Sequence, residues 1–273
     1  MKIGFAQIKG KEGFSENMEQ CLDFMILAGK LELNILCFPE MHLTDFFLSR
    51  RDHHHPFQFA EGIPGPTVER FQKLARELKL AVVLNYMERF NYEYYSASPV
   101  IDSTGKLLGV TRMVHIPQIR GYYAQSYFTP SCGDFQVYNT QYGKVGVLIS
   151  YDRHFPEATR ALALRDADII LIPGFIAEDQ DLDMYRAELR TIAYQNCLYT
   201  GICSRVGVEG GVRFLGKSML AGPDGDILVE GSSECELVVA DIDLAEVRRR
   251  HRENPYLTLR RPDEYLYIIR QYG

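Results

Sequence analysis

The sequence predicts an α/β fold in which two mixed β-sheets are packed between outer layers of helices. Two observations indicate this fold. Short apolar runs rich in β-branched residues, typical of strands, alternate along the chain with amphipathic segments of helical spacing. Several neighbouring strands are separated only by tight-turn sequences, which adds antiparallel hairpins to the pattern. No linker, low-complexity run or short repeat divides the chain, so we expect residues 1–273 to form one domain.

The first half of the chain is expected to hold two helices among five strands. Apolar residues such as Met18 and Met25 recur on one face of the first helix, and Gly62-Ile-Pro-Gly-Pro66 ends the loop before the second. Asp102-Ser-Thr-Gly105 is typical of a hairpin turn. The expected strands are 2–8, 35–38, 80–86, 95–101 and 107–112, and the expected helices are 17–31 and 67–78. Residues 113–134 lack periodicity, and loops of this length in a compact chain are usually functional.

The second half is expected to hold seven strands and two helices. The run from Val145 to Ile149 has no polar alternation, which is typical of a strand buried on both faces. Pro156 and Glu157 suit a helix start, because proline is favoured in the first turn and an acidic residue complements the helix dipole. The expected strands are 135–138, 144–149, 168–172, 198–203, 213–220, 226–230 and 236–240, and the expected helices are 156–164 and 182–197. A basic, polar tail is expected after them.

Composition excludes several classes of function. The hydrophobic content of 46% and charged content of 24% are those of an ordinary soluble globular protein. A net charge of −6 argues against nucleic acid or an anionic membrane as the partner, and no apolar run is long enough to cross a bilayer. The six cysteines are scattered without a Cys-x-x-Cys pair, and no signal peptide is evident. We therefore expect a cytoplasmic protein with reduced thiols, no metal and no cofactor.

Residues 144–157 form the stretch around which the chain is organised. The apolar strand stops at Ser150, and the chain turns through Tyr151-Asp-Arg153 into the helix that begins near Pro156. A residue between a strand end and a helix start is where a nucleophile or an anion site is often built. This stretch closely resembles the nucleophile segment of the nitrilase (carbon–nitrogen hydrolase) superfamily, which places a cysteine where this chain has Ser150.

The similarity to this superfamily covers nearly the whole chain. Its motifs are matched at five further places, namely Phe38-Pro-Glu40, 62–66, 101–110, 221–225 and 259–263, the last resembling the amidase and N-carbamoyl-amide hydrolase branch. The resemblance implies a four-layer αββα sandwich. It also implies a homodimer or a higher homo-oligomer, because family members associate through helices of the outer layer and exchange C-terminal tails. The family-like tail here is 251–266.

The resemblance also implies a set of catalytic positions, of which this chain keeps one. The family uses a glutamate base, a lysine that stabilises the tetrahedral intermediate, and a cysteine nucleophile, often with a second glutamate. The corresponding residues here are Glu40, Met113, Ser150 and, for the second glutamate, Ala124. Methionine supplies neither a charge nor a hydrogen-bond donor. Removing one oxyanion donor typically costs about 2.7–4 kcal/mol of transition-state stabilisation, so ordinary amidase turnover is not expected.

These replacements lead to a hypothesis and two alternatives. The hypothesis is a nitrilase-fold pseudoenzyme, or an enzyme repurposed to another reaction on a small C–N compound, with an amide-like molecule as its ligand. The first alternative is an active amidase-type hydrolase of linear amides or N-carbamoyl compounds that uses Ser150, or an engineered cysteine-to-serine form of one. The second alternative is a non-catalytic scaffold or regulatory partner in an oligomer.

The sequence also leads to expectations for the residues around these catalytic positions and for two other candidate sites. Without a lysine, Glu40 needs another cation or must be protonated, and the cations considered are His42, Arg112, His115, Arg120 and His154. We expect Tyr123, Ala124, Tyr151 and Phe175 to line the pocket. Asp152 and Arg153 are expected to hold the turn after Ser150 together. Cys132 is interpreted as a small turn residue and His53-His54-His55 as a solvated loop, because consecutive histidines diverge too much to share a metal.

Overall fold

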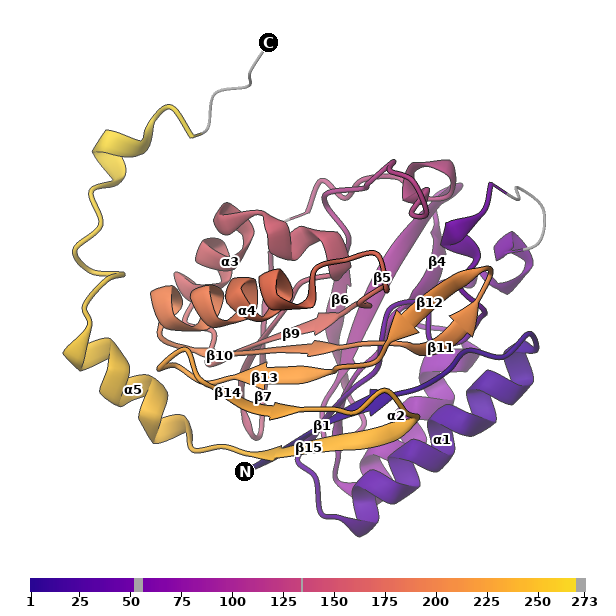
Figure 1. Ribbon diagram of the computed structural model, residues 1–273. Helices are drawn as coiled ribbons and strands as arrows, with labels where there is room; N and C mark the ends of the chain where they lie inside the picture. The colour runs from indigo at the N-terminus through magenta and orange to yellow at the C-terminus, as the bar shows by residue number, and fades with distance from the viewer. Residues whose placement is uncertain (52–55, 134, 269–273) are drawn as a thin grey trace.

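The computed structural model, which describes residues 1–51, 56–133 and 135–268, contains two β-sheets packed face to face between two pairs of helices. Figure 1 shows α1 and α2 on one side of the sheets and α3 and α4 on the other. The four-layer αββα sandwich is therefore confirmed. The helices are α1 (Phe14–Lys30), α2 (Pro66–Leu78), α3 (Pro156–Ala163), α4 (Leu182–Asn196) and α5 (Leu244–Glu253). No helix in these described ranges is both long enough and apolar enough to span a membrane.

The first sheet has parallel strands at its centre and antiparallel strands at its edges. In spatial order it comprises β15 (Glu236–Asp241), β1 (Lys2–Gln7), β2 (Ile35–Cys37), β3 (Ala81–Val83), β5 (Glu93–Ile101) and β4 (Tyr86–Phe90), with β6 (Leu107–Arg112) also paired to β5. Strands β1, β2 and β3 run parallel, since α1 and α2 connect them. The hairpin between β5 and β6 turns at Asp102, whose carboxylate accepts hydrogen bonds from the backbone of Thr104 and Lys106.

The second sheet follows the same plan. Its order is β14 (Ile227–Glu230), β13 (Met219–Ala221), β10 (Tyr199–Cys203), β9 (Ile169–Pro173), β8 (Gly143–Val147) and β7 (Val137–Thr140). Strands β8, β9 and β10 are parallel. A separate hairpin is formed by β11 (Val206–Glu209) and β12 (Val212–Leu215). In open sheets of this type, ligand sites form outside the carboxyl ends of the parallel strands.

The alternation of side chains along the strands explains the layers. In β2, Ile35 and Cys37 face the core between the sheets, whereas Leu36 packs in the core formed with α1 and α2. In β9, Leu171 lies between the sheets and Ile170 packs in the core formed with α3 and α4. Both faces of the central strands are thus buried, which explains why the sequences of these strands are continuous apolar runs.

Two expected strands are wrong in detail, and one further strand was not expected. The expected strand 80–86 is two strands, because Asn85 leaves the ladder and donates its side-chain N–H groups to the Ser96 and Ser98 hydroxyls. The expected strand 213–220 is also broken, at Gly216 and Lys217, which adopt φ values of 71° and 59°. Strand β11, which was not expected, pairs with the first of the two pieces.

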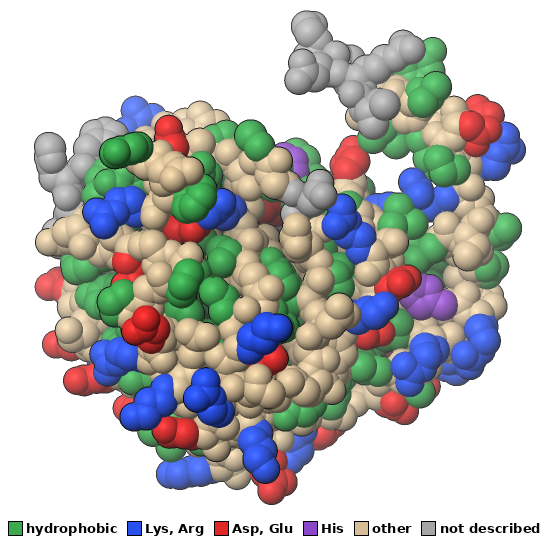
Figure 2. Space-filling view, turned by 180° about the vertical axis from the view of Figure 1, so that it is seen from behind, with side chains coloured by type: hydrophobic (Ala, Val, Ile, Leu, Met, Phe, Trp, Pro, Cys, Tyr) green, Lys and Arg blue, Asp and Glu red, His purple; other side chains and the backbone are tan. Residues whose placement is uncertain are grey.

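The expected polar tail begins with helix α5. Asp243 caps this helix by accepting a hydrogen bond from the Ala245 backbone, and Arg249 pairs with Glu246 and Glu253 along its exposed face. After α5 the chain continues as an arm that arches past α3 and α4 (Figure 1), and only its far end stands clear of the body in Figure 2, since Tyr256 packs against Tyr194 of α4. The apolar residues that this arm exposes are Tyr256, Leu259, Tyr265, Leu266, Tyr267 and Ile268.

Candidate functional site

Glu40 lies in a turn just beyond the carboxyl end of β2 and is fully buried. The turn is fixed through its backbone. Asn85 accepts a hydrogen bond of 2.9 Å from the Met41 N–H, while the Arg205 guanidinium donates to the carbonyl oxygens of Glu40 and Met41 at 2.7 and 2.8 Å. The Glu40 N–H lies 3.4 Å from the carbonyl oxygen of Gly174, which follows β9. The turn therefore joins the ends of parallel strands from both sheets.

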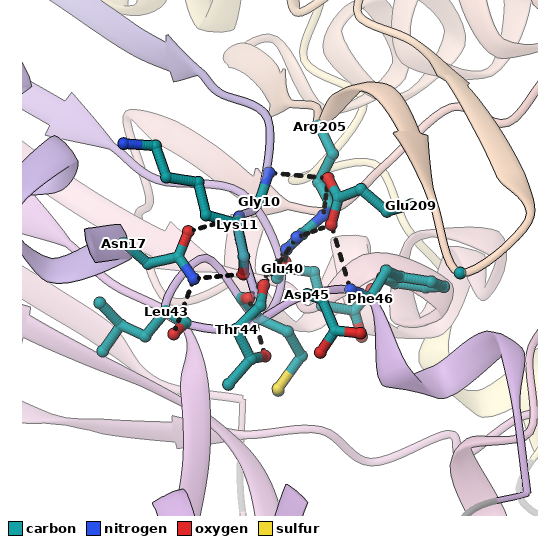
Figure 3. A network of polar contacts seen from close by, with 12 residues as sticks. Gly10, Lys11, Asn17, Glu40, Leu43, Thr44, Asp45, Phe46, Arg205 and Glu209 are labelled. Carbon is teal, nitrogen blue, oxygen red and sulfur yellow. Dashed lines mark hydrogen bonds and ion pairs between the residues drawn. The ribbon is translucent and has the colours of Figure 1, made fainter. Parts of the chain in front are cut away.

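Arg205 is the centre of a buried polar network (Figure 3). Besides the carbonyls of the Glu40 turn, it contacts the Thr44 carbonyl at 2.8 Å and forms an ion pair with Glu209. Glu209 in turn accepts hydrogen bonds from the backbone of Gly10 and Phe46 at 2.8 and 3.1 Å. The guanidinium is thus occupied by backbone carbonyls and its own carboxylate partner. Its role in this arrangement is to hold the Glu40 turn in place.

Ser150 begins the 3-10 turn Ser150–His154 beyond β8 and has a left-handed backbone conformation, with φ of 45°. Two residues further along the turn, Asp152 and Arg153, hold it in place. Asp152 accepts hydrogen bonds of 2.8 Å from both the backbone N–H and the ring Nδ1 of His115. Arg153 donates to the Ser150 carbonyl at 2.7 Å and to Glu188 at 3.0 Å. The expectation that Asp152 and Arg153 hold this turn together is confirmed.

Met113 follows β6 and is fully buried beside Tyr122. The Tyr122 hydroxyl donates a 2.7 Å hydrogen bond to Glu40 Oε1 and lies 4.0 Å from Met113 Sδ. Ser150 also makes polar interactions with Glu40 and Tyr122. The structure therefore brings Glu40, Met113 and Ser150 together, although they are far apart in the sequence. Sequence analysis did not connect Tyr122 with Glu40.

Burial raises the pKa of Glu40 to about 7. Its interactions with Tyr122 and Ser150 and the charges of Arg205 and Arg153 oppose this rise without cancelling it. The second carboxyl oxygen, Oε2, is buried and has no hydrogen-bond partner among the described residues. Burial also raises the pKa of Tyr122 well above its ordinary value, so the phenol remains a neutral donor.

The positive groups that act on the Glu40 carboxylate are not the ones expected from the sequence. Arg112 pairs with Glu88, His115 with Asp152 and His154 with Glu188. Burial lowers the pKa of His42 to about 3, so this imidazole is neutral at neutral pH. Arg120 is exposed at the cavity. The charges that act on Glu40 belong to Arg205 and Arg153, which sequence analysis did not connect with it.

A cavity of about 480 Å³ opens beside Ser150. Its aromatic wall includes Tyr122, Tyr151, Phe175 and Tyr185, and its charged or polar lining is formed by Ser150, Arg120, Arg153, His154, Glu178, Asp179, Gln180 and Arg213. Glu40 and Met113 are fully buried and do not line this cavity, whereas Ser150 and Tyr122, which interact with Glu40, do. A volume of this size suits a small organic molecule.

Two residues expected in the pocket lie elsewhere. The Tyr123 ring packs against the Arg51 guanidinium at 4.7 Å, and its backbone N–H donates a hydrogen bond to the Leu48 carbonyl. Ala124 is fully buried in the apolar cluster that contains Met113. Tyr151 and Phe175 do line the cavity.

Two other groups stand apart from this site. Cys132 is exposed in the loop before β7, and no group of three histidine, cysteine or acidic residues in the described ranges could hold a metal ion. His53, His54 and His55 lie outside the described residues.

Comparisons with known proteins agree with this geometry. A family model described as carbon-nitrogen hydrolase matches residues 2–252. N-carbamoylputrescine amidase from Solanum lycopersicum is 33% identical over 253 residues, covering 86% of this chain and 84% of that protein. Citrullinase from Francisella tularensis is 28% identical, with 100% of this chain and 99% of that protein covered.

Solved structures show the same fold. A carbon-nitrogen hydrolase from Helicobacter pylori G27 superposes with a TM-score of 0.90 at 26% identity, covering 100% of this chain and 99% of that one. A cysteine-to-serine mutant of the Nesterenkonia AN1 amidase from the nitrilase superfamily gives a TM-score of 0.84 at 23% identity, with 98% of each chain covered.

Proposed function

The chain belongs to the carbon-nitrogen hydrolase family, and we propose that it binds a small amide- or urea-type compound beside Ser150 without hydrolysing it at ordinary enzyme rates. One observation carries this proposal. The buried Glu40 carboxyl accepts a hydrogen bond from the neutral phenol of Tyr122, and the Met113 thioether, which lies beside that phenol, stands where the family resemblance implies an ammonium group.

Three chemical deficits argue against turnover. A serine hydroxyl is a weaker nucleophile than a thiolate and needs a base to activate it. Met113 supplies no charge to a developing oxyanion, and the loss of one such donor typically lowers the rate about 10²–10³-fold. Ala124 supplies no second carboxylate. All three deficits weaken the same hydrolysis reaction. Together they support binding of a ligand without its hydrolysis.

The cavity supports a small ligand of the proposed class. Its volume of about 480 Å³ is ample for an amide or ureido compound, and it offers the Ser150 and Tyr122 hydroxyls next to aromatic walls. The relatives named for N-carbamoylputrescine and citrulline act on compounds with a terminal urea-type group. An open cavity of this kind also favours ligand binding over a purely structural scaffold.

A second candidate function is a slow hydrolase that uses Ser150. The pKa of Glu40, raised by burial to about 7, suits a general base near neutral pH, and its polar interaction with Ser150 places that base beside a hydroxyl. The left-handed backbone at Ser150 resembles the strained conformation of many nucleophiles.

Titration calorimetry with N-carbamoylputrescine, citrulline and simple amides tests binding, and ammonia release on the same samples tests hydrolysis. We expect binding heat, and we expect no ammonia release at a rate near the enzyme median of about 10 s⁻¹.

Two variants show whether binding occurs in this cavity. Ala177→Phe, which adds a ring to the cavity wall, should abolish binding, whereas Tyr123→Phe, outside the cavity, should not. Ammonia release that Ser150→Ala abolishes would favour the second candidate. No binding to any compound would overturn both.

A further inference from the structure

The charge of Glu40 is not balanced by a dedicated partner in the described part of the molecule. Oε1 accepts a hydrogen bond from a neutral phenol, and Oε2, though fully buried, has no hydrogen-bond partner among the residues that the structure describes. The two cations that act on Glu40 are committed elsewhere, Arg205 to Glu209 and Arg153 to Glu188. An ionised carboxyl in this position therefore lacks a nearby positive group of its own.

This carboxyl lies one side chain behind the cavity. Ser150 and Tyr122 both interact with Glu40 and both line the cavity wall. A hydroxyl can donate and accept at the same time, so Ser150 can donate to the Glu40 carboxylate while its Oγ accepts an N–H from a ligand. The negative charge of Glu40 strengthens Ser150 as an acceptor.

The cavity wall also suits a cation. Four aromatic residues, Tyr122, Tyr151, Phe175 and Tyr185, line the cavity, and cations are attracted to the faces of aromatic rings. Glu178 and Asp179 add exposed carboxylates at the rim.

The positive groups on the same wall are largely engaged. Arg153 lies over the Tyr185 ring and pairs with Glu188, His154 also contacts Glu188, and Arg213 lies 3.9 Å from Glu178. Only Arg120, which is exposed, has no carboxylate close to it among the described residues.

We propose that the cavity selects a planar amidinium or guanidinium cation over the neutral amide of the same shape, with the cation's N–H groups on Ser150 Oγ and its charge balanced by ionised Glu40. This inference rests on the proposed function, because it specifies the ligand of the same cavity. It predicts that the ligand supplies the positive charge that the protein does not place beside Glu40.

A pH dependence follows from this arrangement. Below the Glu40 pKa of about 7, a cation must displace a proton, so its affinity should fall by up to about tenfold per pH unit. The other groups near Glu40 are Arg205, Arg153, the neutral His42 and Tyr122, and Asp152, which pairs with His115. His154 on the cavity wall is controlled for by His154→Gln.

Titration calorimetry with benzamidine and benzamide, which share one shape, tests the inference. At pH 8 we expect benzamidine to bind at least about tenfold more tightly than benzamide, with the preference shrinking towards pH 6 in the wild type and in His154→Gln. Glu40→Gln should remove the preference and keep benzamide binding. Met113→Lys, which places an ammonium group near Tyr122 and Glu40, should also remove it, whereas the matched Met113→Leu should keep it.

The outcomes separate the inference from the function on which it rests. Benzamide binding as tight as benzamidine in the wild type would overturn the inference and leave the proposed function standing. A preference that persists in Glu40→Gln would assign the cation to Glu178 and Asp179 and overturn the role of Glu40. If neither compound binds, the inference fails, and the titrations with N-carbamoylputrescine and citrulline decide separately whether the proposed function stands. If a variant does not fold, the pH dependence of the preference for benzamidine in the wild type still tests the inference.

Discussion

The Tyr122 hydroxyl donates a 2.7 Å hydrogen bond to Glu40 Oε1 across a separation of 82 residues in the chain. The bond joins a loop to the end of a central parallel strand, and both groups are buried. Because the donor is neutral, it satisfies one carboxyl oxygen without neutralising the charge, and desolvation raises the pKa of Glu40 to about 7.

Replacing Tyr122 by phenylalanine should raise the pKa of Glu40 further, because the hydroxyl that favours the ionised form is removed. It should also cost about 1–3 kcal/mol of folding free energy at pH 8, where a buried carboxylate oxygen loses the phenol that donates to it. Carbon-13 NMR titration of the Glu40 carboxyl and urea unfolding measure the two effects. Tyr123→Phe is the matched control. An unchanged Glu40 pKa in Tyr122→Phe would contradict the assigned hydrogen bond.

Glu40 should make the protein less stable as the pH rises from about 4.5 to about 7. Its pKa is 4.5 ordinarily and about 7 in the folded state, so the folded state holds this proton more tightly than the unfolded chain does. Protonated Glu40 therefore stabilises the fold by about 3 kcal/mol. This contribution is complete below pH 4.5 and is lost as the pH rises through about 7.

Other carboxyl groups titrate in the same range, so the comparison with Glu40→Gln isolates this contribution. The difference in unfolding free energy between wild type and Glu40→Gln, measured by urea denaturation from pH 4 to 9, should shift in favour of the variant by that amount and level off above pH 8. A difference that does not change with pH would show that Glu40 titrates normally.

Arg205→Met should destabilise the fold by about 3–5 kcal/mol, since it leaves the buried Glu209 carboxylate without its positive partner and three backbone carbonyls without their donor. The double variant with Glu209→Gln should lose less than the sum of the single losses, because the two side chains form one network. Lys144→Met, which removes a surface pair with Asp166, should cost less than about 1 kcal/mol. Additive losses at Arg205 and Glu209 would mean that the two do not act as a unit.

We expect the chain to form at least a homodimer through the C-terminal arm. The arm exposes Leu259, Leu266, Tyr267 and Ile268, and an apolar groove runs between the arm and helices α3 and α4. Light scattering at micromolar concentration should give at least twice the monomer mass for the full chain. Truncation after Glu253 should reduce that mass to the monomer's. A full-length chain that is strictly monomeric would contradict this expectation.

The layers of the fold could be predicted from the sequence because they depend on local patterns. The run that forms β8 is apolar on both faces, and Pro156 marks the start of α3. The errors came from contacts that the local sequence does not contain. Asn85 ends β3 because it meets Ser96 and Ser98 across the sheet, and β11 exists because β12 returns beside it.

The candidate site could be predicted only in part, for the same reason. Motif matches brought Glu40, Met113 and Ser150 into one expected pocket. The groups that give Glu40 its properties come from remote segments, and Arg205 is separated from it by 165 residues. A single arginine after an apolar strand carries no local signal for such a role. Likewise, Tyr122 and Tyr123 look equivalent in sequence, but the backbone of Tyr122 pairs with Ile119 and that of Tyr123 with the Leu48 carbonyl, contacts that the sequence does not reveal.

The central claim is that the scaffold retains the family geometry and lacks only the reactive groups. The most direct measurement is covalent labelling by fluoroacetamide, mapped by mass spectrometry, in Ser150→Cys, Met113→Lys and the double variant. The exposed Cys132 and Cys235 report background labelling in every sample. Residues that act as one catalytic unit are strongly non-additive, so we predict rapid labelling at position 150 only in the double variant. A correctly folded double variant whose introduced thiol remains unlabelled would contradict the account.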